Sequence, residues 1–487
     1  MRDVVKGLEP KSLWEHFYQI TQIPRCSKHE EKIREYIVEV AKRNKFEYKM
    51  DSVKSVVVKK PASPGCEEKP IAVLQGHLDM VCEKNKDTPH NFAKDPIKMM
   101  RDNGWIRADG TTLGADNGIG VAAALAVMES DDVQHGPLEF LFTVDEETGL
   151  TGATELGNDM LEGRILINMD SEEDGAFYIG CAGGRDTALI LRMETESVPS
   201  GYKALRVRVG GLQGGHSGMN IHQGNGNAIK LLTRFLWKQA PKFDLRISSI
   251  DGGSMHNAIP RECDAIFYVS PNKITDLKKE AETFDSYFKN EYHAVDPGVS
   301  VSITEGGFEK PEKVLRKDHQ NRLLNLIYSM PHGVMAMSHA VQGLVETSTN
   351  MAVVHTKDEK ISFVTSQRSS VQSALDDIAD MVCAIGMQAG AEVDQGSGYP
   401  AWSPNPESPI LRKAIIVYKS LFDKEPEVKA IHAGLECGII GDKFPGMDMI
   451  SFGPTILGAH SPDERVDIAT VEKFWKLLKA LIEKIAQ

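Results

Sequence analysis

The stretch PIAVLQGHLDMV, residues 70–81, is a run of apolar residues that ends in His77, Leu78 and Asp79. The run is typical of a buried strand, and the side chains of His77 and Asp79, two residues apart, lie on the same side of that strand. A histidine beside an acidic residue can form a structural ion pair, or it can bind a metal while the carboxylate orients the imidazole. The stretch alone does not decide between these two interpretations.

Helices and strands alternate on both sides of this stretch. Helical periodicity occurs at 12–24 and 29–44 and in the Ala-rich segment 115–130. Apolar, strand-like runs occur at 55–60, 138–149 and 164–173. Such alternation predicts an α/β domain with a layered α/β/α architecture.

The pattern changes near residue 183. Segments 185–196, 202–212 and 263–270 alternate apolar and polar residues, as half-buried antiparallel strands do. The α/β pattern returns at about residue 396. We therefore predict one α/β domain in two segments, 1–183 and 396–487, with an inserted α+β domain at 184–395. Three consecutive domains are the alternative, which is disfavoured because 396–487 contains few strand-like runs.

The composition argues against nucleic-acid and membrane partners. The 487 residues include 69 acidic and 56 basic ones, for a formal net charge of −13, whereas nucleic acids and anionic membranes attract basic surfaces. No run approaches the roughly 20 apolar residues of a membrane span, and the N-terminus lacks the apolar core of a signal peptide. The seven cysteines are scattered without a CxxC pair, which predicts reduced thiols and a cytoplasmic location.

Acidic residues and histidines occur where several apolar segments stop. They are His77, Asp79, Asp116, Asp145, Glu146, Glu147, Asp170 and His460. Ligands of open α/β sheets bind beyond the carboxyl ends of the strands, so we expect these side chains to meet. Imidazole and carboxylate ligands suit a pair of divalent metals, with zinc favoured and cobalt or manganese as alternatives. The strand-like run 138–149 includes Glu146 and Glu147, and neighbouring side chains on an extended strand diverge, so one can bind metal while the other acts as general base.

Simpler interpretations exist for each of these residues alone. An aspartate at a helix start is commonly an N-cap, consecutive acids commonly form a solvated turn, and His460 by itself is an ordinary loop histidine. The repetition at strand ends favours the metal site. Other chemistries fit less well, because the sequence contains no HExxH, no GxSxG and no Walker loop. A nucleophilic thiol at Cys82 is a weaker alternative.

Six ordered motifs carry a resemblance that spans nearly the whole chain. They are GHLDMV, GADNGIGVAAAL, DEETGLTGA, NMDSEEDG, GGHSG and LGAHSPDERV. In this order they resemble the dinuclear-zinc metallopeptidase family that contains carboxypeptidase G and carnosinase. The sequences of the motifs and the size of the insert are most similar to those of the aminoacyl-histidine dipeptidase branch of this family.

The resemblance implies a role for each strand-end residue. His77 and Asp170 would hold one metal, Glu147 and His460 the other, and Asp116 would bridge both, with a cis peptide bond to Asn117. Asp79 would orient His77. Glu146 would be the general base and later the acid that protonates the leaving amine.

The resemblance also implies that the inserted domain is a lid used for dimerisation and substrate closure. His216 would stabilise the oxyanion. Asn257 and Arg368 would bind the substrate's C-terminal carboxylate, and Glu436 its α-ammonium. The expected protein is a cytoplasmic homodimer with two metal ions per chain, in which metal-activated hydroxide cleaves unblocked dipeptides, X-His dipeptides among them. An aminoacylase or carboxypeptidase on the same scaffold is the nearest alternative. A non-catalytic, metal-stabilised binding protein is disfavoured because Glu146 is present.

Overall fold

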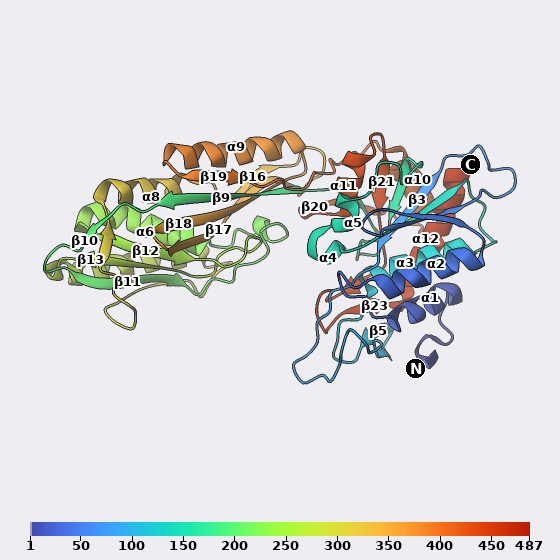
Figure 1. Ribbon diagram of the computed structural model, residues 1–487, viewed down its shortest axis with the longest axis horizontal. Helices are drawn as coiled ribbons and strands as arrows, with labels where there is room; N and C mark the ends of the chain where they lie inside the picture. The colour runs from blue at the N-terminus through green and yellow to red at the C-terminus, as the bar shows by residue number, and fades with distance from the viewer. Residues whose placement is uncertain (1) are drawn as a thin grey trace. The chain divides into compact units, whose positions relative to one another are not determined.

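The computed structural model describes residues 2–487, which divide into two compact units (Figure 1). The first unit contains the chain up to Cys181 together with Pro404–Ala430 and Leu435–Gln487. The second contains Ala182–Ser403 and the short piece Ile431–Gly434.

These bounds differ from those expected from the sequence, and backbone hydrogen bonds explain why. Gly184 and Tyr399 exchange N–H···O bonds of 3.0 and 2.9 Å, which ties the segment after residue 395 to the second unit. The N–H of Ala182 donates to the carbonyls of Ile431 and Ala433, which brings the four-residue piece into the same unit. No periodicity in the sequence marks either contact.

An eight-stranded sheet forms the centre of the first unit, in the order β1-β2-β6-β3-β7-β21-β8-β20. Its strands are β1 (Glu47–Met50), β2 (Val56–Lys60), β3 (Ala72–His77), β6 (Leu138–Thr143), β7 (Ile165–Asn168), β8 (Ala176–Cys181), β20 (Glu427–Ile431) and β21 (Asp448–Ser451). The central strands β6, β3, β7 and β21 are parallel, and every residue of β3 and β6 is buried. Burial on both faces explains why these strands read as continuous apolar runs rather than alternating ones. Since β21 pairs with β7, two distant pieces of sequence share one sheet.

Helices cover this sheet in two groups (Figure 1). α3 packs on β3 and α1 on α3, while α10 packs on β21 and α12 on α10. The helices of this unit are α1 (Lys11–Thr21), α2 (Glu31–Arg43), α3 (Ala115–Glu129), α4 (Glu146–Gly149), α5 (Thr151–Thr154), α10 (Pro409–Phe422), α11 (Glu436–Lys443) and α12 (Ile468–Ala486), after a 3-10 turn at Arg2–Val5. A four-stranded sheet, in the order β22-β23-β5-β4, adds β4 (Met99–Asp102), β5 (Trp105–Ala108), β22 (Ile456–Leu457) and β23 (Arg465–Asp467). The predicted layered α/β class is confirmed.

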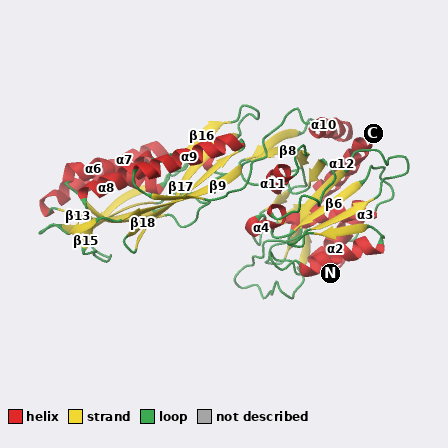
Figure 2. Cartoon of the chain, turned by 45° about the horizontal axis from the view of Figure 1, so that its top comes forward, coloured by secondary structure: helices red, strands yellow, loops and turns green. Residues whose placement is uncertain are grey.

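The second unit is an α+β structure built on a nine-stranded antiparallel sheet. Its strands are β9 (Gly183–Arg192), β11 (Lys203–Gly210), β12 (Arg246–Gly252), β13 (Cys263–Val269), β14 (Ser300–Thr304), β16 (Gly333–Met337), β17 (Val345–Lys357), β18 (Lys360–Ser369) and β19 (Glu392–Gln395), beside the two-stranded pair β10 (Thr195–Ser197) and β15 (Lys313–Leu315). Figure 2 shows helices along one side of this sheet, namely α6 (Ala228–Phe243), α7 (Ile274–Tyr292), α8 (Lys317–Ser329) and α9 (Gln372–Gln388), with 3-10 turns at Ile221–Gln223 and Pro271–Lys273. Most of the buried apolar side chains of these helices and strands form one core, which is separate from that of the first unit, and two small clusters lie beside it.

One prediction from the cysteines is wrong. Cys26 and Cys82 form a disulfide across 56 positions of sequence, with Cα atoms 5.7 Å apart, whereas five cysteines are free. The two segments meet because residues 26 and 80 pair as a parallel bridge, a contact that cysteine spacing does not encode. Among residues 2–487, no helix is long and apolar enough to cross a membrane.

Candidate metal centre

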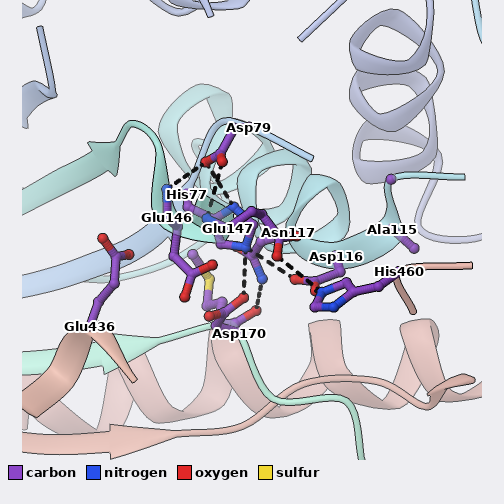
Figure 3. Close-up of polar contacts among 12 residues, drawn as sticks. His77, Asp79, Ala115, Asp116, Asn117, Glu146, Glu147, Asp170, Glu436 and His460 are labelled. Carbon is purple, nitrogen blue, oxygen red and sulfur yellow. Dashed lines mark hydrogen bonds and ion pairs between the residues drawn. The ribbon is translucent and has the colours of Figure 1, made fainter. Parts of the chain in front are cut away.

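The carboxyl ends of the central strands lie side by side in the first unit. Register pairs His77 with Thr143 and Gln75 with Asn168, and Asn168 in turn pairs with Ser451. The chain that leaves β3, β6 and β7 therefore carries its polar residues to one edge of the sheet. The structure thereby brings together the strand-end residues that the sequence singled out (Figure 3).

His77 and Asp79 lie against each other at the end of β3. The imidazole Nδ1 is 3.3 Å from Oδ1 of Asp79, and both side chains are buried. The Asp79 carboxylate also accepts the backbone N–H groups of Glu146 and Glu147, at 3.0 and 3.2 Å, and the Ser27 hydroxyl at 2.8 Å. Asp79 therefore contacts the Nδ1 side of His77, opposite the Nε2 side that faces Asp116 and Asp170, as an orienting group would.

Asp116 lies between the two histidines. Its Oδ1 is 3.1 Å from Nε2 of His77, and its Oδ2 is 3.1 Å from Nε2 of His460. The peptide bond between Asp116 and Asn117 is cis, in agreement with what the resemblance implies. Each oxygen of one carboxylate thus faces a different imidazole.

Asp170 and Glu147 complete the two groups around Asp116. Asp170 Oδ1 lies 3.2 Å from His77 Nε2, and Glu147 Oε2 lies 3.0 Å from His460 Nε2. Two sets of potential ligands share Asp116, namely His77–Asp116–Asp170 and Asp116–Glu147–His460, each with donor atoms within 4.8 Å of one another. Two further sets that meet the same limit, His77–Glu146–Glu147 and Glu30–Asp79–Asp145, do not include Asp116.

The expectation that Glu146 and Glu147 continue a strand is wrong. The strand β6 ends at Thr143, Asp145 has a left-handed φ of 51°, and both glutamates lie in the short helix α4. Successive side chains of a helix point about 100° apart, so the two glutamates still diverge. Glu147 turns to His460, while Glu146 also lies within reach of His77.

Burial and charge shift the pKa values of these groups strongly. Burial raises the pKa of Asp170 to about 7 and raises that of Glu146 well above its usual range. Hydrogen bonds to Asp116 and Glu147 raise the pKa of His460 to about 11. Burial would lower the pKa of His77, but the surrounding carboxylates outweigh it and raise that pKa.

The donor set suits divalent cations. Several carboxylates share a poorly solvated space, and Oδ1 of Asp170 is buried without a hydrogen-bond partner. Cations at these positions would relieve the repulsion between carboxylates and would bind the Asp170 oxygen, whose contact with His77 lacks hydrogen-bond geometry. Imidazole nitrogens and carboxylate oxygens are ligands that zinc and related metals accept.

Glu436 lies at the same edge of the sheet. It is fully buried at the start of α11, and its Oε2 accepts hydrogen bonds from Gln75 and Thr143 at 2.6 and 2.7 Å. Its Oε1 is buried without a hydrogen-bond partner, and burial raises the pKa of the carboxyl to about 7. The second oxygen can therefore accept from a bound cationic group.

The other three predicted residues lie in the second unit. Nδ1 of His216 accepts the backbone N–H groups of Gly218 and Met219, at 3.2 and 3.0 Å. This acceptor role leaves the proton of the neutral imidazole on Nε2, and burial together with Arg368 lowers the pKa of His216 to about 4. Asn257, partly exposed, accepts the N–H of Ser217 through its backbone carbonyl.

Arg368 is the centre of a cluster that sequence reasoning only partly found. Its Nη1 donates to the Tyr399 hydroxyl at 2.7 Å, while its Nε is buried without a partner. His432 lies nearby with Nε2 2.7 Å from the Ser348 hydroxyl, and burial lowers the pKa of His432 to about 3. His432, Ser348 and Tyr399 were missed because they reach this cluster from separate parts of the sequence.

The chain is similar to known peptidases along most of its length. Residues 73–484 match the model of Peptidase family M20/M25/M40. The chain is 43% identical over 478 residues to the cytosol non-specific dipeptidase of Escherichia coli strain K12, with 98% of each chain covered. The crystal structure of aminoacylhistidine dipeptidase from Vibrio alginolyticus superposes with a TM-score of 0.91 at 41% identity, covering 98% of this chain and 97% of that one.

A more distant structure shares the fold alone. That of aminopeptidase PepT from Bacillus cereus matches with a TM-score of 0.57 at 15% identity, over 99% of this chain and 100% of that one. The family match covers most of the chain, from β3 with His77 to the last helix, and spans the whole metal centre. The chain belongs to the Peptidase family M20/M25/M40.

Proposed function

We propose that this peptidase is a dinuclear-metal dipeptidase that hydrolyses unblocked dipeptides. The observation that carries the proposal is the placement of Asp116, whose two oxygens face two separate imidazoles at 3.1 Å. A carboxylate in this position can bridge two cations roughly 3.5–4 Å apart, as in two-metal hydrolases.

The two ligand sets divide five residues between two ions. His77 and Asp170 would hold the first, Glu147 and His460 the second, and Asp116 both. Zinc fits these ligands best, and cobalt and manganese are the alternatives. Bound ions of this kind polarise a carbonyl and acidify water.

Glu146 is the proposed general base and acid. Its carboxyl is poorly solvated and reaches toward His77, yet Glu147 rather than Glu146 turns to His460. Burial raises the pKa of Glu146, so its carboxyl can hold a proton taken from water and then donate that proton to the leaving amine. Asp79 contacts both the imidazole of His77 and the start of α4, and thereby fixes their positions relative to each other.

Recognition of both ends of a dipeptide would limit substrate length. The unpaired Oε1 of Glu436 suits an α-ammonium group, and Arg368 with Asn257 suits the C-terminal carboxylate. His216 presents an N–H at Nε2 and would donate to the oxyanion of the tetrahedral intermediate. We assign the second unit the role of a lid, because it carries three of these four residues, and we add a role in dimerisation by resemblance to the family.

Two relatives support this substrate class. One is named a cytosol non-specific dipeptidase and the other an aminoacylhistidine dipeptidase. By analogy we propose broad dipeptide specificity that includes X-His dipeptides, a cytoplasmic location and a homodimer.

A peptide panel tests the proposal. Dipeptides with free termini, the same dipeptides with N-acetyl or amide caps, and tripeptides are compared at equal concentration, with elemental analysis after dialysis. We expect about two ions per chain and turnover of the free dipeptides only. Efficient hydrolysis of N-acetylated amino acids would favour an aminoacylase, and efficient hydrolysis of tripeptides would favour a carboxypeptidase.

A further inference from the structure

Glu464 is a buried carboxylate that binds the backbone next to Asp116. It follows His460 by four residues and is only 2% exposed. Its Oε2 accepts the N–H groups of Leu113 and Gly114 at 2.7 and 2.8 Å, and its Oε1 accepts those of Ala115 and Asp116 at 2.7 and 3.2 Å. Four successive N–H groups therefore converge on one side chain.

The local backbone makes this convergence feasible. Gly114 has a left-handed φ of 71°, a conformation that turns successive N–H groups toward one concavity. A Cβ at Gly114 would lie 2.5 Å from Nη2 of Arg25 and 2.8 Å from the sulfur of Met80, so only glycine fits there. Hydrogen bonds to an ionised carboxylate are stronger than those between neutral groups, which favours a fixed loop.

Arg25 binds a carbonyl group of the same loop, whereas Glu464 binds its N–H groups. Its buried Nη2 donates to the carbonyl of Gly114, and its Nη1 donates to the carbonyls of Leu78 and Asp79 at 2.9 and 2.6 Å. Arg25 thus joins the Asp116 loop to the chain that leaves β3 just after His77. Its positive charge also attracts Glu464.

Together the two side chains connect three segments that carry proposed metal ligands. Glu464 joins the His460 segment to the Asp116 loop, and Arg25 joins that loop to the His77 segment. Neither contact uses a ligand side chain, so the connection does not depend on bound metal. A bridging carboxylate must face both ions at once, and a small shift of its backbone would lose one of the two contacts.

We propose that Glu464 and Arg25 are positioning residues that fix the Asp116 carboxylate between the two ions and thereby set the affinity for the pair. The inference rests on the proposed function, because it requires Asp116 to bridge two ions. It adds a role for two residues that neither bind metal nor touch substrate.

Glu139 offers a matched control for Glu464. It is also 2% exposed, and its Oε2 accepts the N–H groups of Glu162 and Gly163 at 3.0 and 2.9 Å. It lies near the start of β6, whereas the metal centre lies beyond the end of that strand. Glu464→Gln and Glu139→Gln therefore each remove a buried carboxylate that accepts backbone N–H groups, but only one of them lies at the centre.

The experiment compares metal binding by wild type, Glu464→Gln and Glu139→Gln. Apo-proteins are titrated with Zn²⁺ against a chromophoric chelator, and with Co²⁺ while the visible absorption of the ion is recorded. We expect Glu464→Gln to bind the pair about 10–100-fold more weakly, with an altered Co²⁺ spectrum, as for other losses of groups that support ligands. Glu139→Gln should keep the wild-type affinity and spectrum, even where its melting temperature falls. At saturating Zn²⁺, Glu464→Gln should regain most of kcat with an unchanged KM.

Three outcomes overturn the inference. The first is wild-type affinity and spectrum in Glu464→Gln, and the second is an equal loss of affinity in Glu139→Gln. If Glu464→Gln does not fold, Glu464→Asp takes its place, because it keeps the charge but is one methylene too short to reach all four N–H groups. The third outcome is wild-type metal affinity in Glu464→Asp. A wild type that binds fewer than two ions instead overturns the proposed function, and the inference with it.

Discussion

Two histidines of the metal centre and two histidines beside Arg368 are in opposite electrostatic surroundings. In the first unit His77 and His460 lie among carboxylates, and their pKa values rise, that of His460 to about 11. In the second unit burial and the nearby Arg368 lower the pKa values of His216 and His432 to about 4 and about 3. The imidazole is therefore held in contact with carboxylates at the metal centre and favoured in its neutral form beside Arg368.

This contrast indicates two kinds of binding site. The first unit gathers negative charge that divalent cations would neutralise. The second unit combines a guanidinium with neutral imidazoles, of which His216 presents an N–H donor, and this combination suits an anion. A dipeptide hydrolase needs both kinds of site.

The largest effect is expected from Glu146→Gln in the first unit. The variant keeps the shape of the side chain but cannot carry a proton, so kcat should fall by about 10²–10⁴-fold with little change in KM. Metal content, measured by elemental analysis, should stay near that of the wild type. Glu147→Gln is the matched variant and should instead lower metal occupancy. The reverse pattern would show that the roles of the two glutamates are exchanged.

His216→Ala alters the second unit. Loss of an oxyanion donor costs about 10²–10³-fold in kcat, and both ions should remain bound because no proposed ligand changes. Steady-state kinetics and metal analysis check this.

Mixed dimers re-formed from His216→Ala and Glu146→Gln chains show whether the histidine acts in its own chain. Recovered activity would mean that it acts across the dimer, and full activity of His216→Ala alone would remove it from the mechanism.

A smaller effect is expected from Glu436→Gln. Removing the charge that would receive the α-ammonium should raise KM for dipeptides by about 10–100-fold, since a hydrogen bond to a charged group contributes about 1.5–3 kcal/mol. Metal affinity should not change. An unchanged KM would mean that the buried Oε1 has a structural role.

The smallest effect on turnover is expected from removing the disulfide of the first unit. Cys26→Ser with Cys82→Ser should change kcat less than twofold, while the loss of a cross-link over 56 positions should lower the free energy of unfolding by about 4 kcal/mol. Thermal unfolding checks this, with Cys66→Ser as control because Cys66 is a buried free thiol. Titration of seven rather than five thiols in the denatured, unreduced protein would show that the cross-link does not form in solution.

The layered α/β class and the residues that meet in the first unit could be predicted from sequence for one physical reason. His77, Asp116, Asp170 and His460 each follow an apolar segment or open a helix, and the ends of parallel strands share one edge. Glu464 and Arg25 carry no such mark, because their partners are backbone groups that only the fold brings near. Glu464 nevertheless lies inside the motif that contains His460, which is the one local signal that could have found it.

Other features could not be predicted because they depend on long-range contacts or on a single dihedral angle. The pairing of Cys26 with Cys82 needs the bridge between residues 26 and 80. The helix at Glu146 begins because Asp145 takes a left-handed conformation, which the apolar run before it does not indicate. The assignment of Ile431–Gly434 to the second unit depends on hydrogen bonds from Ala182, far away in the sequence.

The position of β21 in the central sheet has a consequence for biosynthesis. This strand lies between β7 and β8, yet residues 182–447 are translated after β8 and before β21. At about 5–20 residues per second, the ribosome takes roughly 15–50 s over that interval. Throughout it β7 and β8 each lack the neighbour that β21 provides, and unpaired strand edges are prone to aggregate. Chaperone demand should therefore peak late in translation, and truncation before Asp448 should leave an insoluble product even though most of the proposed ligands have already been made.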